Sequence, residues 1–141
     1  MVFHRVTDSQ SIYYDYVAPS ASDGRCVVFV NALTGSTEMW QTAAIATALH
    51  ARGHGTLCYN FRGQALSGYG GPDDAKPDVI VADLVALLAA VAPPRPILVG
   101  LSIGGLFAAQ ARLRGAAADA LVFINTLRKP GVRLDWINNA M

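Results

Sequence analysis

The stretch ILVGLSIGGLFAAQA, residues 97–111, decides the fold because it passes from a short apolar run through a serine between glycines into an alanine-rich segment. The apolar run predicts a strand, and the segment after the serine predicts a helix. Residues 100–104 (GLSIG) fit the pattern G-x-S-x-G, in which a serine lies on a sharp strand-to-helix turn with its hydroxyl exposed. This pattern in this context predicts a nucleophile at Ser102.

The residues around Ser102 fit such a turn for steric and electrostatic reasons. A side chain at Gly100 or Gly104 would collide across a turn that holds the serine in a strained backbone conformation. The helix that begins near Ile103 directs its free N–H groups to the place where an oxyanion would form. Glycine-rich turns also pack helices on sheets and bind phosphate, so a turn without catalytic function is the alternative.

Short apolar runs alternate with helical patterns along the rest of the chain. The expected strands are 2–7, 11–17, 26–30, 55–60, 96–100 and 119–124, and the expected helices are 38–52, 77–92 and 103–114. Thr37 is expected to cap the first helix, the first two strands to form a hairpin, and the tail to add a short helix near its end. The alternation predicts an α/β fold with a doubly wound, mostly parallel sheet, as one domain over residues 1–141.

The charge balance argues against a polyanionic partner. The 141 residues include 11 Lys and Arg against 10 Asp and Glu, a net charge of +1, without a basic stripe or an acidic tail. We therefore expect neither nucleic acid nor a membrane surface as a partner. The N-terminal residues lack a secretory signal, and no apolar segment reaches membrane-spanning length, so a cytoplasmic location is expected.

Neither a metal nor a cofactor is expected from the sequence. Cys26 and Cys58 lie inside expected strands rather than in loops with metal-ligand spacing, and we predict that both are buried free thiols. A dinucleotide-binding function fits poorly, because GLSIGG is not G-x-G-x-x-G and no acidic residue follows a second strand at the expected distance.

The chain resembles the α/β-hydrolase family over roughly residues 20–125, in three stretches. Besides GLSIGG, the stretch VVFVNALTGS (27–36) is similar to the family's strand and oxyanion loop, with Asn31-Ala32 where the family usually has His-Gly. Residues 60–67 (NFRGQALS) are similar to the family's D-x-R-G-x-G-x-S turn, with Asn and Ala in two of its places. The three matches follow in the family's order and are more specific than the serine motif alone.

The resemblance implies where a substrate would react. It places the strand 26–30 beside the strand 96–100, at a point where the crossovers reverse direction and ligands bind. The backbone N–H groups of Leu33 and Ile103 would then form the oxyanion hole. The family continues with further strand and helix units, so the fold is expected to be truncated after about the sixth strand.

No histidine follows Ser102, although a serine needs an adjacent base and the family's partners follow in the order serine, acid, histidine. The three histidines, His4, His50 and His54, all precede the serine. His50 and His54 are expected at the amino-terminal edge of the sheet, away from the nucleophile. The acid and the base of the triad are therefore expected outside this chain.

Two asparagines are candidates for supporting positions around the site. Asn31 lies in the stretch similar to the oxyanion loop. Asn125 follows the last strand at the correct edge, where it could orient an imidazole but could not supply its compensating negative charge. Asp119 enters the last strand from the wrong edge, and Asp135 lies in the tail, where the sequence does not place it.

Part of the sheet is expected to be bare. The helices 77–92 and 103–114 would cover one face and the helix 38–52 the other, yet one helix covers roughly 10 Å while six strands span about 30 Å. The strand 119–124 would also be a hydrophobic edge that is open to pairing. A complementary polypeptide or a homo-oligomer is expected to cover both the open face and this edge.

Two functions from different classes fit these patterns. The first is an esterase- or lipase-like serine hydrolase, inactive as the isolated chain, in which Ser102 attacks a small-molecule ester-like substrate once a second chain or segment supplies His and Asp. The second is a catalytically inactive α/β-hydrolase-like interaction module, such as a homodimer. The missing histidine is compatible with both.

Overall fold

The computed structural model describes residues 2–126, and its elements follow the alternation that the sequence predicts. In chain order they are β1 (Val2–Arg5), β2 (Ser11–Val17), β3 (Cys26–Val30), α1 (Glu38–Thr42), α2 (Ile45–His50), β4 (Gly55–Tyr59), the 3-10 helix η1 (Pro72–Ala75), α3 (Pro77–Val91), β5 (Pro96–Leu101), α4 (Ile103–Leu113) and β6 (Ala120–Ile124). The short helix expected near the end of the tail, and Asp135 with it, lie outside the described residues.

The strands form one mixed sheet in the order β1-β2-β4-β3-β5-β6. β1 and β2 form the expected antiparallel hairpin, which joins β4, while β4, β3, β5 and β6 run parallel. In the parallel register Val28 lies between Leu57 of β4 and Leu98 of β5. β3 therefore lies beside β5, as the resemblance implied, and the predicted α/β class is confirmed.

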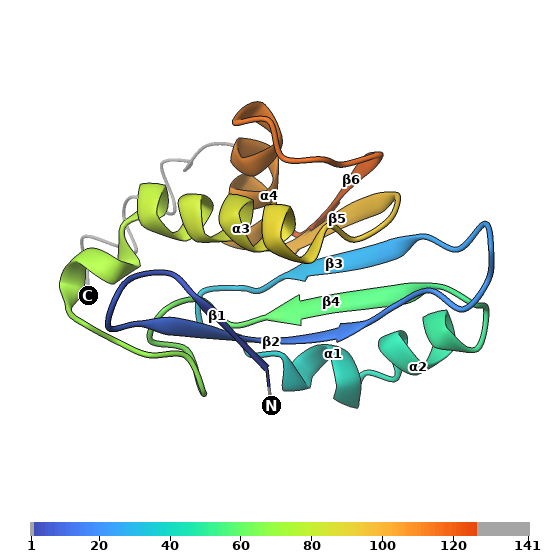
Figure 1. Ribbon diagram of the computed structural model, residues 1–141, viewed down its shortest axis with the longest axis horizontal. Helices are drawn as coiled ribbons and strands as arrows, with labels where there is room; N and C mark the ends of the chain where they lie inside the picture. Colours follow the sequence, from blue (N-terminus) through green and yellow to red (C-terminus); the bar gives the residue numbers. More distant parts are fainter. Residues whose placement is uncertain (1, 127–141) are drawn as a thin grey trace.

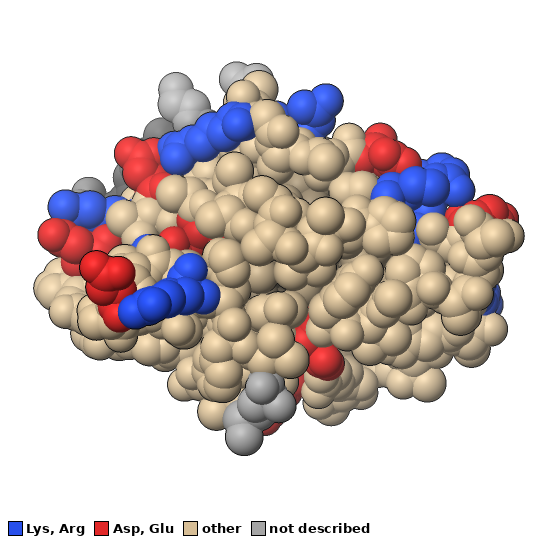
Figure 2. Space-filling model, viewed as in Figure 1, with Lys and Arg blue, Asp and Glu red and all other residues tan. Residues whose placement is uncertain are grey.

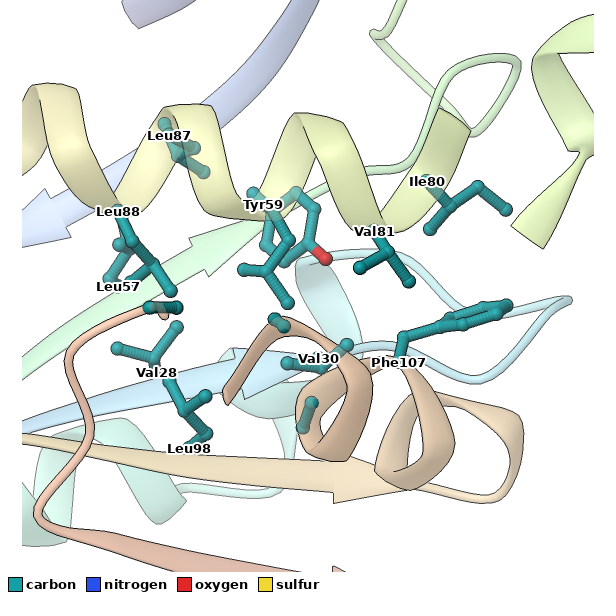
Figure 3. Packing of buried hydrophobic residues seen from close by; sticks show 14 of the residues in the cluster. Val28, Val30, Leu57, Tyr59, Ile80, Val81, Leu87, Leu88, Leu98 and Phe107 are labelled. Atoms are coloured by element: carbon teal, nitrogen blue, oxygen red, sulfur yellow. The ribbon is translucent and has the colours of Figure 1, made fainter. Parts of the chain in front are cut away.

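Helices cover both faces of the sheet (Figure 1). α3 and α4 lie on one face, where their apolar side chains pack against β3, β4 and β5. Figure 3 shows this core, with Leu88 of α3 pointing toward Leu57 and Val28 of the sheet. α1 lies on the opposite face, where Trp40 stacks on Phe29 with ring centroids 4.4 Å apart. Because helices cover both faces, all five residues of β3 and of β4 are buried.

The edge strand β6 carries exposed apolar side chains, as expected for an unpaired edge. Phe123 is 52% exposed, and Val122 and Ile124 are 43% and 39% exposed. Within residues 2–126, β6 pairs only with β5. Among the described residues, the outer side of β6 is therefore a row of unpaired backbone groups flanked by apolar side chains. We call residues 120–124 the open edge.

The helix predicted over 38–52 is wrong as a single element. It divides into α1 and α2 because Ala44 adopts a left-handed conformation (φ 56°), which interrupts the helical path. The predicted cap at Thr37 is also wrong. Thr37 has helical dihedral angles and makes no side-chain cap; instead its backbone N–H donates to Asn60 Oδ1 at 2.9 Å. The side chain of Asn60, in the connection after β4, thus satisfies the Thr37 N–H.

Both cysteines are buried and free, as predicted. Burial raises the pKa of the Cys26 and Cys58 thiols to about 12. These thiols are therefore neutral core side chains at physiological pH.

On the face that Figure 2 shows, basic and acidic side chains lie near one another in small groups, and broad uncharged areas separate these groups. Among residues 2–126, no helix combines the length and apolar character needed to cross a bilayer.

Candidate active site

Ser102 lies on a sharp turn between β5 and α4. Its dihedral angles, φ 54° and ψ −123°, are strained for any residue other than glycine. The backbone N–H donates to the carbonyl oxygen of Ile124 at 2.9 Å, which ties the turn to the end of β6. The residue is exposed. A hydroxyl here is accessible at the carboxyl edge of the parallel strands, where α/β sheets bind ligands.

Three glycines let α4 approach the sheet at this turn. A Cβ at Gly100 would lie 2.5 Å from the carbonyl carbon of Gly104, and a Cβ at Gly104 would lie 2.9 Å from that of Val30. A Cβ at Gly105 would lie 2.9 Å from Cβ of Thr126. Contacts this short cannot form with a side chain in place. The need for Gly105 was missed in the sequence, although the Gly-Gly pair after the serine signals it.

The sequence predicts that the backbone N–H groups of Leu33 and Ile103 form an oxyanion hole. Val30 pairs with Gly100 in the parallel register, so the loop after β3 leaves the sheet beside the turn at Ser102. Within the described part of the chain, neither the Leu33 N–H nor the Ile103 N–H has a hydrogen-bond partner. Leu33 is 59% exposed, and Ile103 begins α4, where N–H groups point out of the helix end. Within residues 2–126, both donors are therefore unpaired.

Asn31 is a buried residue whose side-chain hydrogen bonds support the loop after β3. Its Nδ2 donates to the Tyr59 carbonyl at 2.8 Å, and its Oδ1 accepts from Trp40 Nε1 at 2.7 Å. The side chain thus joins the end of β3 to β4 and to α1. It is fully buried, so it supports the loop rather than facing a substrate.

The turn after β4 contacts the same loop from the other side. Gln64 Nε2 donates to the carbonyl oxygens of Ala32 and Leu33 at 3.0 and 2.7 Å, and its Oε1 accepts from the Phe61 N–H at 3.0 Å. Sequence reasoning matched this turn to the family pattern without assigning a role to Gln64. Asn60, also in the turn, is fully buried, and its Nδ2 has no partner in the described residues.

Arg62 anchors that turn to α3. Its Nε and Nη2 donate to both carboxylate oxygens of Asp83 at 2.7 Å, and its Nη1 lies 3.1 Å from Asp74 Oδ1. The hydrogen bonds to Asp83, which outweigh the opposing effect of burial, raise the pKa of the guanidinium. The Gly70 N–H, together with Gln10 and Arg62, lowers the pKa of Asp74. These charge-assisted hydrogen bonds thus fix the position of Arg62, which lies two residues before Gln64 in the same turn.

A cavity of about 280 Å³ opens beside the loop, between the turn after β4 and the start of α3. Its lining is mainly apolar and includes Leu33, Phe61, Tyr69 and Ile80. A cavity of this size and character is suited to a small apolar group.

None of the three histidines lies at Ser102. His54 Nδ1 accepts from the Arg25 N–H at 3.3 Å, and His50 Nε2 lies 2.9 Å from Thr56 Oγ1. Both lie near the amino ends of β3 and β4, while Ser102 follows the carboxyl end of β5. His4 is on β1, which β2, β4 and β3 separate from β5. Within residues 2–126, the structure therefore places no histidine beside the Ser102 hydroxyl.

The remaining candidates divide between the two edges of the sheet. Asp119 pairs with Arg25 at 2.9 Å at the amino end of β6. Asn125 follows β6 at the carboxyl edge, exposed and with a positive φ of 49°. Asn125 thus shares an edge with Ser102, whereas Asp119 does not.

Comparisons with known proteins identify the family of this chain and agree with its fold. A model of the alpha/beta hydrolase family matches residues 27–141. A protein of Variovorax paradoxus (strain S110) that carries the name carbamate hydrolase RutD is 34% identical over 126 residues, 84% of this chain and 44% of that protein.

Solved structures share the fold. A carboxylesterase structure from Nitrososphaera gargenis has a TM-score of 0.81 at 20% identity and covers 99% of this chain and 50% of its own. The esterase EaEST of Exiguobacterium antarcticum has a TM-score of 0.75 at 17% identity and covers 88% of this chain and 44% of its own. The chain spans about half the length of the relatives that it matches.

Proposed function

The chain belongs to the alpha/beta hydrolase family, and from this premise we propose that it carries the nucleophile and the oxyanion hole of a serine hydrolase. The observation that carries the proposal is the strained, exposed turn at Ser102, together with the N–H groups of Leu33 and Ile103, which have no partner among residues 2–126. Nucleophile and oxyanion donors in one place are what acyl transfer requires.

The proposed reaction cleaves an ester-type acyl bond in two steps. A base removes the proton from Ser102 Oγ as the oxygen attacks the acyl carbon, and the N–H groups of Leu33 and Ile103 bind the resulting oxyanion. The intermediate collapses to an acyl-enzyme, and the base returns the proton to the departing alcohol. Water then releases the acid by the same route. Loss of one oxyanion donor in such sites raises the barrier by about 3 to 4 kcal/mol.

The base and its acid come, in this proposal, from a segment outside residues 2–126, on a second polypeptide or further along the gene product. Such a segment would also cover the open edge, because the next parallel strand would pair with β6. Two features favour this hypothesis: none of the three histidines lies at Ser102, and the chain spans 44% of its Variovorax relative.

Small esters and carbamates are the proposed substrate class. The relative named as a carbamate hydrolase and the neighbour titled as an esterase both suggest attack at an acyl carbon that bears a heteroatom leaving group. The apolar cavity beside Leu33 would hold a small apolar substituent of such a substrate.

The test is hydrolysis of p-nitrophenyl acetate and of a p-nitrophenyl carbamate by the chain co-expressed with the coding sequence that lies directly downstream. Ser102→Ala should lower kcat by at least about 10³-fold, because loss of a triad member leaves only binding and the oxyanion hole. Ser9→Ala, in the exposed β1–β2 connection, is the control. Equal activity of wild type and Ser102→Ala would refute the proposal.

The open edge favours a second candidate function, an interaction module without catalysis. The exposed Val122, Phe123 and Ile124 would be buried in a homodimer through β6. A dimeric mass in analytical ultracentrifugation, reduced to that of a monomer by Phe123→Lys, together with no hydrolysis under any co-expression, would favour this function over the first.

A further inference from the structure

The side chain of Gln64, in the turn after β4, forms hydrogen bonds to the loop after β3. The side-chain amide crosses from the turn after β4 and donates to two successive carbonyl oxygens, those of Ala32 and Leu33. Its own oxygen accepts from Phe61 N–H at 3.0 Å and lies 3.4 Å from Asn31 Nδ2. Both ends of the amide are therefore held, and the side chain is a fixed bridge between two loops.

Gln64 and the Gly35 N–H, which donates to the Ala32 carbonyl oxygen at 3.0 Å, together set the direction of the neighbouring N–H groups. In a trans peptide the C=O and the N–H of one unit point in opposite directions. The unit that carries the Ala32 carbonyl also carries the Leu33 N–H. Because Gln64 holds this carbonyl on its own side, the Leu33 N–H points away from Gln64.

The order of the strands relates the direction of the Leu33 N–H to the position of Ser102. β3 lies between β4 and β5, so the loop after β3 has the turn with Gln64 on one side and Ser102 on the other. A Leu33 N–H that points away from the β4 side points toward the β5 side. This N–H has no partner among residues 2–126, as expected of a donor kept for a ligand.

We infer that Gln64 is a positioning residue that aims the Leu33 N–H across the loop toward Ser102. The inference rests on the proposed function for its catalytic meaning, but the geometry itself can be measured without catalysis. The loop position that usually holds glycine in the family is Ala32 here, and Gln64 binds the carbonyl of this residue directly.

The direct test is NMR of the full chain, wild type against Gln64→Met, which keeps the length of the side chain and removes its donors. We expect the backbone order parameters at Leu33 and Thr34 to fall from about 0.85 to below about 0.6, with changed N–H residual dipolar couplings. Gln41→Met is the matched control, since Gln41 donates its amide to Asp15 on the exposed surface and should leave both quantities unchanged.

A kinetic measurement tests whether the hydrogen bonds of Gln64 affect the reaction. In an active preparation, Gln64→Met should lower kcat for p-nitrophenyl acetate about 10- to 100-fold with KM within about threefold, because the oxyanion forms only during reaction. A wild type that remains inactive when it is co-expressed with the downstream coding sequence would overturn the proposed function and leave the NMR test valid. Unchanged order parameters and couplings in Gln64→Met, or an unchanged kcat beside an active wild type, would overturn the inference.

Discussion

Gly104, in the first turn of α4, lies directly against the backbone carbonyl of Val30, the last residue of β3. A Cβ at Gly104 would come within 2.9 Å of that carbonyl carbon. This contact holds the turn at Ser102 beside the loop that carries Leu33. We expect Gly104→Ala to lower the free energy of unfolding by about 1 to 3 kcal/mol through overpacking, measured by urea denaturation.

Gly68→Ala is the control for that substitution. A Cβ at Gly68 would lie 3.6 Å from the Ser11 carbonyl oxygen, an ordinary contact. This variant should therefore unfold within about 0.5 kcal/mol of wild type. Equal stability of Gly104→Ala and Gly68→Ala would contradict the close packing of α4 on β3.

The ion pair between Arg62 and Asp83 predicts a large loss on substitution. The two side chains are 11% and 8% exposed, and removal of Arg62 would leave two carboxylates, Asp83 and Asp74, without their cation. Arg62→Met should therefore cost about 3 to 5 kcal/mol of unfolding free energy. Lys76→Met breaks the exposed pair with Asp73 and should cost less than about 1 kcal/mol. Similar losses in both variants would show that burial does not decide the energy of these pairs.

The lowered pKa of Asp74 predicts that the protein loses stability in acid. Its hydrogen bonds from Gly70, Gln10 and Arg62 lower its pKa in the folded protein, so the folded state favours the ionised form. The stabilisation is present above the pKa of the unfolded chain, about 3.9, and is lost as the pH falls through the lower folded value. Between pH 5 and pH 2, the Asp74→Asn variant should lose less unfolding free energy than wild type. Parallel curves for the two proteins would contradict this assignment.

The buried cysteines predict slow reaction with thiol reagents. With pKa values of about 12, about one thiol in 10⁴ is ionised at pH 8, and the thiolate is the reactive form. Ellman's reagent at pH 8 should modify neither Cys26 nor Cys58 in the folded chain and both in guanidinium. With Cys58→Ser, one thiol should react after unfolding. Rapid modification of the folded protein would show that these residues are accessible.

The parallel strands could be predicted from the sequence because their burial on both faces requires continuous apolar runs. β3 and β5 are runs of this kind, and the serine motif between β5 and α4 fixes the direction of the chain there. The break at Ala44 could not be predicted, because alanine itself favours a helix. The left-handed conformation reflects the packing of two short helices on a sheet face that tertiary contacts define.

The site was less predictable where it depends on contacts between distant loops. The position of Ser102 follows from a local motif, but the hydrogen bonds of the Asn31 side chain depend on Trp40 and Tyr59. The role of Gln64 depends in the same way on a loop that is 31 positions away in sequence. Such contacts arise from the order of the strands, which no short stretch of sequence encodes.

The central claim is that Ser102 becomes a nucleophile when a base from outside residues 2–126 reaches it. Its most direct measurement is labelling by a fluorophosphonate, with the adduct located by mass spectrometry, in the chain alone and in the chain co-expressed with the downstream coding sequence. We predict an adduct on Ser102 in the co-expressed protein, little or none in the chain alone, and none in Ser102→Ala. An adduct on another residue, or equal labelling of Ser102→Ala and wild type, would contradict the account.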